Sequence, residues 1–370
     1  MREGWEYKKL GEVCEIYQPR TLSTDMLTGT GDYPVYGANG IIGYYNQYNH
    51  KDKEVLLTCR GATCGTINIS KPYSWINGNA MIIHRKSEEM FFDYLKYLML
   101  SIDYSFIITG AAQPQITRQK LAPTKIGIPP KCTQLAIVSE LDKINELIRL
   151  KEEQLKDLDK LAQSIFYEMF GDPVENEKGW EVKKLNEIVS DNCSISYGIV
   201  QPGDGIENGV PVVRPVDMTG TFVYRQGLKN TTKEISDSYK RTILKGNEIL
   251  MCVRGTTGLI AMASSELRGC NVTRGITPIE CGKSCNKWFI YYQISNSSIQ
   301  QYIAEYTRGI ALKQINMKDV RDIPLCLPPL PLQQLFAHRI EQIEHQKAEV
   351  QKSITDLETL LASRMQYWFE

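Results

Sequence analysis

The chain has 370 residues, enough for two or three domains that each bury a core of their own. Its hydrophobic content of 42% and charged content of 23% are ordinary for a soluble globular protein, and it holds no apolar run long enough to cross a membrane. Lysine plus arginine equals aspartate plus glutamate at 43 each, which excludes the overall basic excess of a protein that binds nucleic acid by charge alone. Because Met1 is followed at once by Arg2 and Glu3, without a signal peptide, we expect a cytoplasmic protein without membrane contacts.

The first part of the chain mixes strand and helix patterns. It opens with GWEYKKLGEV at Gly4–Val13. Short β-like runs follow at 33–46, 54–61 and 79–85, separated by Gly, Asn and Asp, and residues 91–102 favour a helix. These patterns predict an α+β domain over residues 1–132, with Trp5 as a core anchor rather than a platform for base stacking.

A heptad pattern follows Pro129 and Pro130 and predicts a coiled-coil helix over residues 133–171. Gly171 and Pro173 supply its stop signal. The 32 steps from Ile137 to Met169 rise about 48 Å, comparable with the ~34 Å of one DNA turn. The predicted seam consists of Ile137, Leu141, Ile144, Ile148, Lys151, Leu155, Leu158, Ala162, Ile165 and Met169.

The remaining chain repeats this layout. GWEVKKLNEI at Gly179–Ile188 is followed by strand-like runs at 210–218 and 248–255 and by a helical stretch at 288–306. We expect a second α+β domain over residues 172–331, anchored by Trp180, and a second coiled-coil helix over residues 332–370. Its predicted seam consists of Phe336, Ile340, Ile343, Lys347, Val350, Ile354, Leu357, Leu361, Arg364 and Trp368.

The two halves are internal copies. LLTCRGATCGTI from Leu56 matches ILMCVRGTTGLI from Ile249, and residues 116–170 align with residues 315–369 at a constant offset of 199. Heptads commonly form homodimers, but two compatible seams in one chain favour pairing within the chain. The sequence therefore predicts two mixed α/β domains, separated by two long helices that form an antiparallel intramolecular coiled coil, with pseudo-twofold symmetry and one domain at each end.

Leu147, Leu161 and Leu360 fall beside the predicted seams and widen the apolar stripe. Two interpretations remain open. The leucines contact the globular domains, or they dock helices of a partner protein in a local four-helix arrangement.

Sequence motifs for catalysis or metal binding are lacking. The chain has no Asn-Pro-Pro-aromatic motif for adenine methylation and no GxxxxGK[ST] loop for ATP. Asp172, Glu181 and Lys183 only loosely resemble a nuclease motif, and Asp172 falls at the predicted helix end. The ten cysteines are scattered and the histidines number four, so we expect structural thiols and no metal site. We therefore expect a protein that is not an enzyme.

The whole chain resembles the specificity subunits of type I restriction-modification systems. The resemblance rests on the two GWE-x-KKL openings, the paired Arg60-Gly61 and Arg254-Gly255 motifs, and Gln115-Ile116 with Gln314-Ile315. The Pro-Pro pairs, each followed by Gln134 or Gln333, complete the set. The resemblance implies a sequence-specific DNA-binding subunit whose two target-recognition domains each read half of an asymmetric bipartite site.

The same resemblance implies the partners. These would be double-stranded DNA, two methyltransferase (modification) subunits that use S-adenosylmethionine, and motor-nuclease (restriction) subunits that use ATP and magnesium. No cofactor would bind this chain, and the coiled coil would set the spacing between the half-sites. The alternative is a protein-interaction scaffold that does not bind DNA, with two diverged binding domains on a coiled-coil spacer.

Two groups of polar residues are candidate DNA contacts. Gly-flanked turns carry Arg60, Thr63, Arg254, Thr256 and Thr257, and the arginines could instead form internal salt bridges. The loops before each helix carry Gln113, Gln115, Arg118, Arg308, Lys313 and Gln314, whose amide and guanidinium groups suit adenine and guanine. Such loops could instead be merely solvated.

Overall fold

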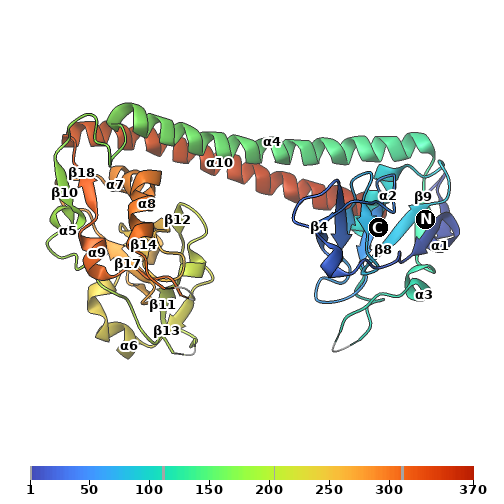
Figure 1. Ribbon diagram of the computed structural model, residues 1–370, viewed down its shortest axis with the longest axis horizontal. Coiled ribbons are helices and arrows are strands. Elements are labelled where there is room, and N and C mark those ends of the chain that lie inside the picture. Colours follow the sequence, from blue (N-terminus) through green and yellow to red (C-terminus); the bar gives the residue numbers. More distant parts are fainter. Residues whose placement is uncertain (1, 111–112, 204, 310–311) are drawn as a thin grey trace. The chain divides into compact units, whose positions relative to one another are not determined.

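The computed structural model describes residues 2–110, 113–203, 205–309 and 312–370. The chain forms two compact units, Met1–Glu152 with Lys352–Glu370, and Glu153–Gln351 (Figure 1). Each unit thus contains one globular part and a portion of both long helices. The domain limits of the sequence prediction, which treat the helices as separate segments, stay a prediction.

The first unit contains strands, one 3-10 helix and three short helices before the first long helix. In chain order they are β1 (Glu6–Lys9), α1 (Leu10–Val13), β2 (Cys14–Tyr17), η1 (Thr24–Met26), β3 (Tyr33–Gly37), β4 (Gly40–Tyr45), β5 (Val55–Thr58), β6 (Ile67–Ile69), β7 (Trp75–Ile76), β8 (Ala80–Arg85), α2 (Phe92–Ser101), α3 (Arg118–Leu121) and β9 (Lys125–Ile128). The long helix α4 (Lys131–Phe170) follows and continues into the second unit.

The second unit has a similar succession of elements. They are β10 (Val182–Lys184), α5 (Leu185–Ile188), β11 (Val210–Val213), η2 (Pro215–Asp217), β12 (Phe222–Val223), β13 (Lys229–Thr231), α6 (Lys233–Ser238), η3 (Lys240–Thr242), β14 (Ile249–Cys252), β15 (Ile260–Ala263), η4 (Ser265–Leu267), β16 (Asn271–Val272), β17 (Ile276–Ile279), α7 (Lys287–Ser295), α8 (Ser297–Glu305), α9 (Met317–Arg321) and β18 (Pro324–Cys326). The second long helix, α10 (Leu330–Phe369), returns to the first unit.

The sheets show that the duplication of the sequence is also a duplication of structure. Each unit has a four-stranded sheet (β2-β8-β5-β6 and β12-β15-β14-β17), a three-stranded sheet (β4-β3-β7 and β13-β11-β16) and a two-stranded sheet (β1-β9 and β10-β18). In both two-stranded sheets, the strand of the GWE-x-KKL opening pairs antiparallel with the strand that precedes a long helix. The repeated opening motif thus joins the start of each globular part to the foot of its helix.

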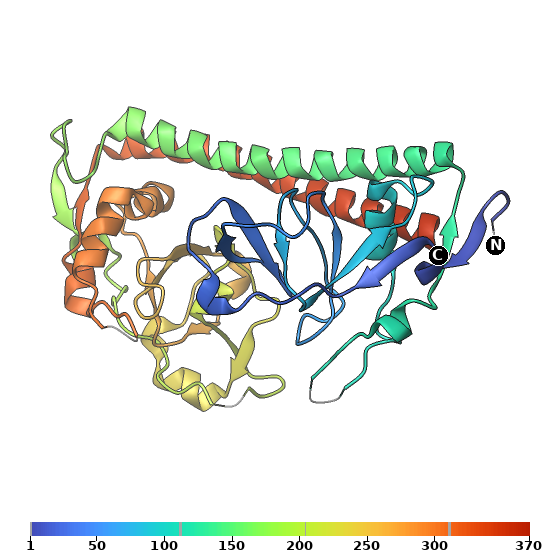
Figure 2. The same cartoon turned by 45° about the vertical axis from the view of Figure 1, so that its right-hand side comes forward.

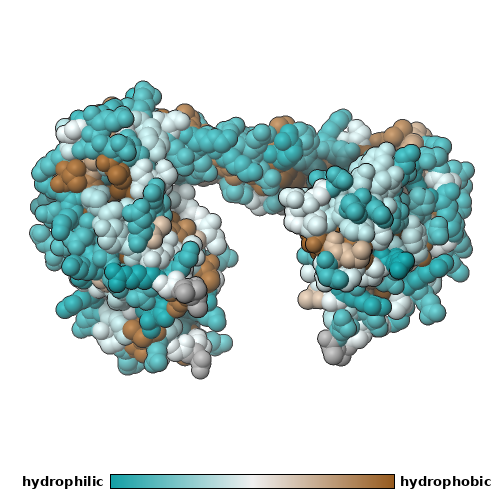
Figure 3. Space-filling model, in the orientation of Figure 1, coloured by the Kyte–Doolittle hydropathy of each residue, from teal (hydrophilic) through white to brown (hydrophobic). Residues whose placement is uncertain are grey.

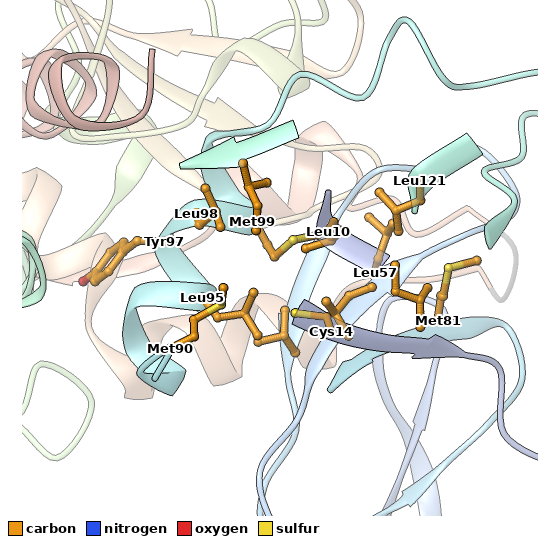
Figure 4. Close-up of a cluster of buried hydrophobic side chains, with 14 of the residues drawn as sticks. Leu10, Cys14, Leu57, Met81, Met90, Leu95, Tyr97, Leu98, Met99 and Leu121 are labelled. Carbon is orange, nitrogen blue, oxygen red and sulfur yellow. The ribbon is translucent and has the colours of Figure 1, made fainter. Parts of the chain in front are cut away.

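The core of the first unit lies between α2 and the four-stranded sheet. Leu95, Leu98 and Met99 of α2 face Leu10 and Cys14 (Figure 4). All five side chains are buried, and burying one aliphatic side chain of this size stabilises a fold by about 1.5–3 kcal/mol. The predicted α+β character with mixed sheet and helix is confirmed.

Each long helix is fixed to its globular part by a buried glutamine four or five residues after the Pro-Pro pair. Gln134 accepts a hydrogen bond from the Phe91 amide (2.9 Å) and donates to the carbonyls of Glu89 (2.9 Å) and Pro129 (3.0 Å). Gln333 repeats this, accepting from the Asn286 amide (2.9 Å) and donating to the carbonyls of Pro328 and Ser284. The repeated Pro-Pro and Gln motif therefore forms the same helix junction twice.

The helices α4 and α10 pack antiparallel in each unit (Figures 1 and 2). In the first unit, the Arg364 guanidinium binds Glu140, and the Trp368 indole donates to the same carboxylate at 2.9 Å. In the second unit, Lys347 lies 2.8 Å from Asp159 of the facing helix. The predicted antiparallel coiled coil within the chain is confirmed.

Most predicted seam residues lie on the buried stripe of the helices. Ile137, Leu141, Ile144, Leu158, Phe336, Ile340, Ile343, Val350 and Ile354 are buried, and Ile148, Leu155 and Leu357 are half-buried. Near the end of α4 the buried line moves from Ile165 and Met169, which are half-buried, to Phe166 and Phe170. Phe166 and Phe170 pack against Phe289 of α7 and Phe336 of α10, with ring centroids 4.7–5.8 Å apart. The globular part thus supplies the contact that a simple two-helix seam lacks.

Two predicted elements differ from the structure. The helical stretch at 288–306 is two helices, because Asn296 has an extended backbone and its side chain caps α8 by accepting from the Ser298 amide. The strand predicted at 210–218 ends at Val213, since Pro215 begins a 3-10 turn. As predicted, Gly171 ends α4 with a positive φ of 74°.

Candidate nucleic-acid interface

The structure joins the two groups of candidate DNA contacts in the first unit. The amide of Gly61 donates to the carbonyl of Pro114 at 3.0 Å, and the amide of Ile116 donates to the carbonyl of Cys59 at 3.0 Å. Arg60 and Gln115 therefore lie opposite each other in an antiparallel bridge. The Arg-Gly turn after β5 and the loop before α3 form one surface, which we call the first junction (residues 59–63 and 113–118).

The second unit contains the same arrangement. The amide of Gly255 donates to the carbonyl of Lys313 at 2.9 Å, and the amide of Ile315 donates to the carbonyl of Val253 at 3.1 Å. Arg254 thus lies opposite Gln314 in a bridge of the same type. We call this surface the second junction (residues 253–257 and 312–315).

A tight hairpin supports each junction. Thr109 and Gln115 exchange two backbone hydrogen bonds (2.9 and 2.7 Å), as do Arg308 and Gln314 (both 2.8 Å). Gly110 and Gly309 have φ values of 91° and 103°, and a Cβ at either one would lie within 2.4 Å of a carbonyl oxygen across the hairpin. Only glycine fits both requirements at Gly110 and Gly309, and the paired backbone hydrogen bonds hold Gln115 and Gln314 in place.

The turn glycines play a different part. Gly61 and Gly255 have φ values of 91° and 86°, yet a Cβ built on either would meet no atom within 4 Å. The space next to each Arg-Gly turn is therefore open, which would allow a DNA backbone to approach closely.

The candidate side chains of the first junction face solvent. Those of Arg60, Thr63, Gln113, Gln115 and Arg118 are exposed. Arg118 is the first residue of α3, directly after the loop. The five candidates thus occupy neighbouring positions on two segments that are far apart in sequence.

The second junction is more enclosed. Thr256, Arg308 and Lys313 are exposed, whereas Arg254, Thr257 and Gln314 are half-buried. The Gln314 amide donates to the Tyr197 hydroxyl at 3.3 Å, and the Thr257 and Thr307 hydroxyls are 3.1 Å apart. The two units therefore present different polar groups on the same backbone frame.

Among the candidate DNA contacts, Arg254 has a buried hydrogen-bond donor that lacks an acceptor in the described ranges. Its Nε atom is buried and has no hydrogen-bond partner among the described residues. Nor does Arg60 or Arg254 form an ion pair within the described part of the chain. A buried donor without an acceptor costs about 1–3 kcal/mol.

The cysteines beside the Arg-Gly motifs lack the properties of nucleophiles. Burial raises the pKa of the Cys59 thiol, and it raises the pKa of Cys252 to about 11. Both thiols are therefore protonated at neutral pH. No group of three or more metal-binding side chains occurs within residues 2–110, 113–203, 205–309 and 312–370.

The residues of the loosely nuclease-like motif have structural partners. Asp172 accepts hydrogen bonds from the amides of Val174 and Glu175 and from the Ser298 hydroxyl, so it closes the turn after α4. Glu181 and Lys183 form an ion pair with each other at 3.3 Å.

Sequence patterns did not single out Phe106, which at 88% is the most exposed large hydrophobic side chain among the described residues. It precedes the hairpin of the first junction, in a turn held by buried Tyr104, whose hydroxyl donates to the carbonyl of Met99 at 2.7 Å. Ile107 and Ile108 pack against the core. The turn therefore presents an aromatic ring to solvent, and only the exposure of Phe106 in the structure distinguishes it from a core residue.

The long helices keep apolar side chains on their surface. Leu147, Leu161 and Leu360 are each between 45% and 48% exposed, and hydrophobic patches along the helices are visible in Figure 3. Roughly half of each side chain is covered, so contact with the globular domains and docking of partner helices both stay predictions. Within the described residues, no helix combines the length and apolar character needed to cross a bilayer.

These features define a class of internally duplicated proteins. The two domains each mix helices and strands, carry the same polar junction, and are joined by one antiparallel pair of helices. Residues 2–160 and 177–359 match the family model of the type I restriction modification DNA specificity domain. The chain belongs to this family. It is a type I specificity subunit that recognises DNA sequence, and the alternative of a scaffold without DNA binding is not supported.

Individual relatives agree with this assignment. The chain is 24% identical over 383 residues to the putative type I restriction enzyme MjaX specificity subunit of Methanocaldococcus jannaschii, covering 92% of this chain and 87% of that protein. It is 27% identical over 178 residues to the type I restriction enzyme EcoBI specificity subunit of Escherichia coli, covering 48% of this chain and only 37% of that protein.

A solved structure shares the fold. The S subunit of a type I restriction-modification system from M. genitalium superposes with a TM-score of 0.57 at 14% identity, covering 99% of this chain and 96% of that one. A structure from a study of complex assembly and conformational transition of the type I system gives a TM-score of 0.58 at 18% identity, covering 99% and 97%.

Proposed function

We propose that each globular part reads one half of an asymmetric, split DNA sequence through its junction. The single observation that carries this proposal is the same Arg-Gly and Gln arrangement in both units, with an Arg254 Nε in one of them that lacks a hydrogen-bond partner among the described residues. Arginine pairs with guanine and glutamine with adenine in the major groove. Because the surrounding side chains differ between the junctions, the two half-sites should differ.

The long helices would act as the spacer. They are 40 residues each and antiparallel, so a change in their length alters the separation of whatever each globular part binds. The coiled coil would therefore set the number of base pairs between the half-sites.

The subunit would contribute recognition and no catalysis. Methylation would come from two methyltransferase subunits with S-adenosylmethionine, and cleavage from motor-nuclease subunits with ATP and magnesium. The exposed leucines of α4 and α10 offer an apolar surface for docking the methyltransferase helices, in the cytoplasm. The near balance of charges fits a reader whose partners share the phosphate contacts.

Inserting one heptad into both helices tests this function. Seven residues add about 10.5 Å of helix, close to three base-pair steps of about 3.4 Å. We expect the assembled methyltransferase complex to methylate a motif with the same half-sites and a changed gap, longer by about three base pairs. In a matched control, the exposed polar residues of one heptad are replaced and the length of the helix is kept. An unchanged gap in the lengthened protein would refute the role of the helices as spacer.

A further inference from the structure

The second unit contains an open hollow next to its junction. Its volume is about 440 Å³, and α6, η3 and the segment before β11 form its wall. The α6 end of this unit lies away from α7 and α10 (Figure 1). The lining residues are Ser196, Tyr197, Asp237, Ser238, Tyr239, Lys240, Arg241 and Thr242.

Tyr197 links the hollow to the second junction. Tyr197 lines it, and the hydroxyl of this tyrosine accepts the 3.3 Å hydrogen bond from Gln314. A molecule that contacts Gln314 would therefore meet the hollow directly beside it.

Buried hydrogen bonds fix the wall of the hollow. The fully buried Asn271 amide donates to the Ser236 hydroxyl at 3.1 Å and contacts the carbonyls of Ser236 and Tyr239, while its oxygen accepts from the Thr242 hydroxyl at 2.7 Å. The backbone that carries Lys240 and Arg241 is thus pinned on both sides. On the opposite wall, the Arg321 guanidinium donates to the carbonyl of Ile195 at 2.7 Å, next to Ser196.

The charged side chains that line the hollow favour a bound anion. Lys240 and Arg241 are exposed, and neither forms an ion pair within the part of the chain that the structure describes. The hydroxyls of Ser196 and Tyr197 add hydrogen-bond donors, whereas the Ser238 hydroxyl already donates to the carbonyl of Ile235 at 2.6 Å. Asp237 is the one carboxylate of the lining, and it opposes the two cations.

We propose that this hollow holds the sugar-phosphate backbone of the DNA half-site whose bases face the second junction. Lys240 and Arg241 bind consecutive phosphates, and the hydroxyls bond to the phosphate oxygens between them. This inference rests on the proposed function, because it extends the DNA contact of the Arg254–Gln314 bridge. It also makes a prediction of opposite sign for Asp237, whose charge repels the strand.

The test measures DNA affinity of the complete complex with its methyltransferase subunits, by fluorescence anisotropy at several salt concentrations. One DNA duplex carries the motif that the complex methylates, and a second duplex of equal base composition lacks this motif. The variants are K240A/R241A, D237N and R254A. Lys283→Ala serves as the matched control, since Lys283 is an exposed cation of the same unit beside Ser284, whose carbonyl accepts from Gln333 at the foot of α10.

We expect K240A/R241A to bind both duplexes roughly tenfold more weakly, with a salt dependence shallower by about 1.8 in log–log slope, because each phosphate contact contributes about 0.9. D237N should bind both duplexes a few times more tightly, and K283A should match the parent. Binding by K240A/R241A and D237N that equals that of K283A would overturn the inference. If R254A then still loses preference for the motif duplex, DNA recognition by the junction stands without the hollow. If R254A also keeps its preference, the proposed function of the junction fails as well.

Discussion

Lys347 gives a quantitative test of how the two long helices are held in register. Its ammonium lies 2.8 Å from both Asp159 and Glu344 and donates to the Thr221 hydroxyl at 3.4 Å. The lysine side chain is only 17% exposed, Glu344 is 12% exposed and Asp159 is 54% exposed. Burial lowers the pKa of Lys347, but the two carboxylates outweigh this effect and raise it overall. The ion cluster is thus formed at neutral pH.

The internal duplication supplies the perturbation. At the offset of 199 residues, Lys347 corresponds to Ile148 and Glu344 corresponds to Asn145. K347I introduces the residue of the other copy but leaves the Glu344 carboxylate buried and unpaired. K347I/E344N introduces both residues of the other copy and leaves only the exposed Asp159 without its partner.

Breaking a buried ion pair costs about 3–5 kcal/mol, and we reduce this to about 2–3 kcal/mol because half of Asp159 stays in water. With roughly 2–4 °C per kcal/mol for a unit of this size, K347I should lower Tm by about 4–12 °C. K347I/E344N should recover most of this loss, because removing the whole buried cluster leaves no unpaired charge in the seam. Differential scanning calorimetry and urea unfolding of the full chain measure both effects. A K347I protein as stable as the parent, or a double variant no better than the single one, would refute the reasoning.

Three further predictions concern other sites. R254A should abolish the preference of the methyltransferase complex for its motif at one half-site, and R60A should do so at the other half-site. Methylation of plasmids with single-base changes in each half measures both effects. Loss of preference at the same half in both variants would contradict the assignment of one half to each unit. Q333L leaves the Asn286 amide and two carbonyls without partners and should lower the free energy of unfolding by about 3 kcal/mol in urea titrations. The same change at the exposed Gln346 of α10 should cost little, and equal losses in the two variants would argue against the hydrogen bonds. The hydrogen bond from Arg364 holds the pKa of Glu140 below its usual value of 4.5. The pair therefore stabilises the fold fully above pH 4.5, and this stabilisation is lost as the pH falls through the lowered pKa of Glu140. The free energy of unfolding measured from pH 6 to pH 3 should fall less steeply in E140Q than in the parent, and parallel curves would count against the pair.

The fold was predictable because its main signals are periodic and repeated. The heptads marked α4 and α10, and two compatible seams in one chain indicated antiparallel pairing within it. The repeated glutamines marked the start of each long helix, but the sequence did not reveal what these side chains bind. They accept hydrogen bonds from the amides of Phe91 and Asn286, which belong to segments more than 40 residues earlier.

The candidate site was predictable only as separate pieces. Arg60 and Gln115 are both visible in sequence, but their bridge joins residues that are far apart along the chain, and no local pattern announces it. Lys240 and Arg241 look like any solvated cations until the Asn271 hydrogen bonds place them around a hollow. The shift of the seam to Phe166 and Phe170 likewise depends on Phe289, which belongs to the globular part and not to the heptads.

Genome-wide mapping of adenine methylation tests the central claim most directly. Cells that express the methyltransferase subunit are compared with and without this chain, and with the R254A variant. The account predicts one split, asymmetric motif that is methylated only when the chain is present, and that loses definition in one half with R254A. Methylation of the same motif in the absence of the chain would contradict it.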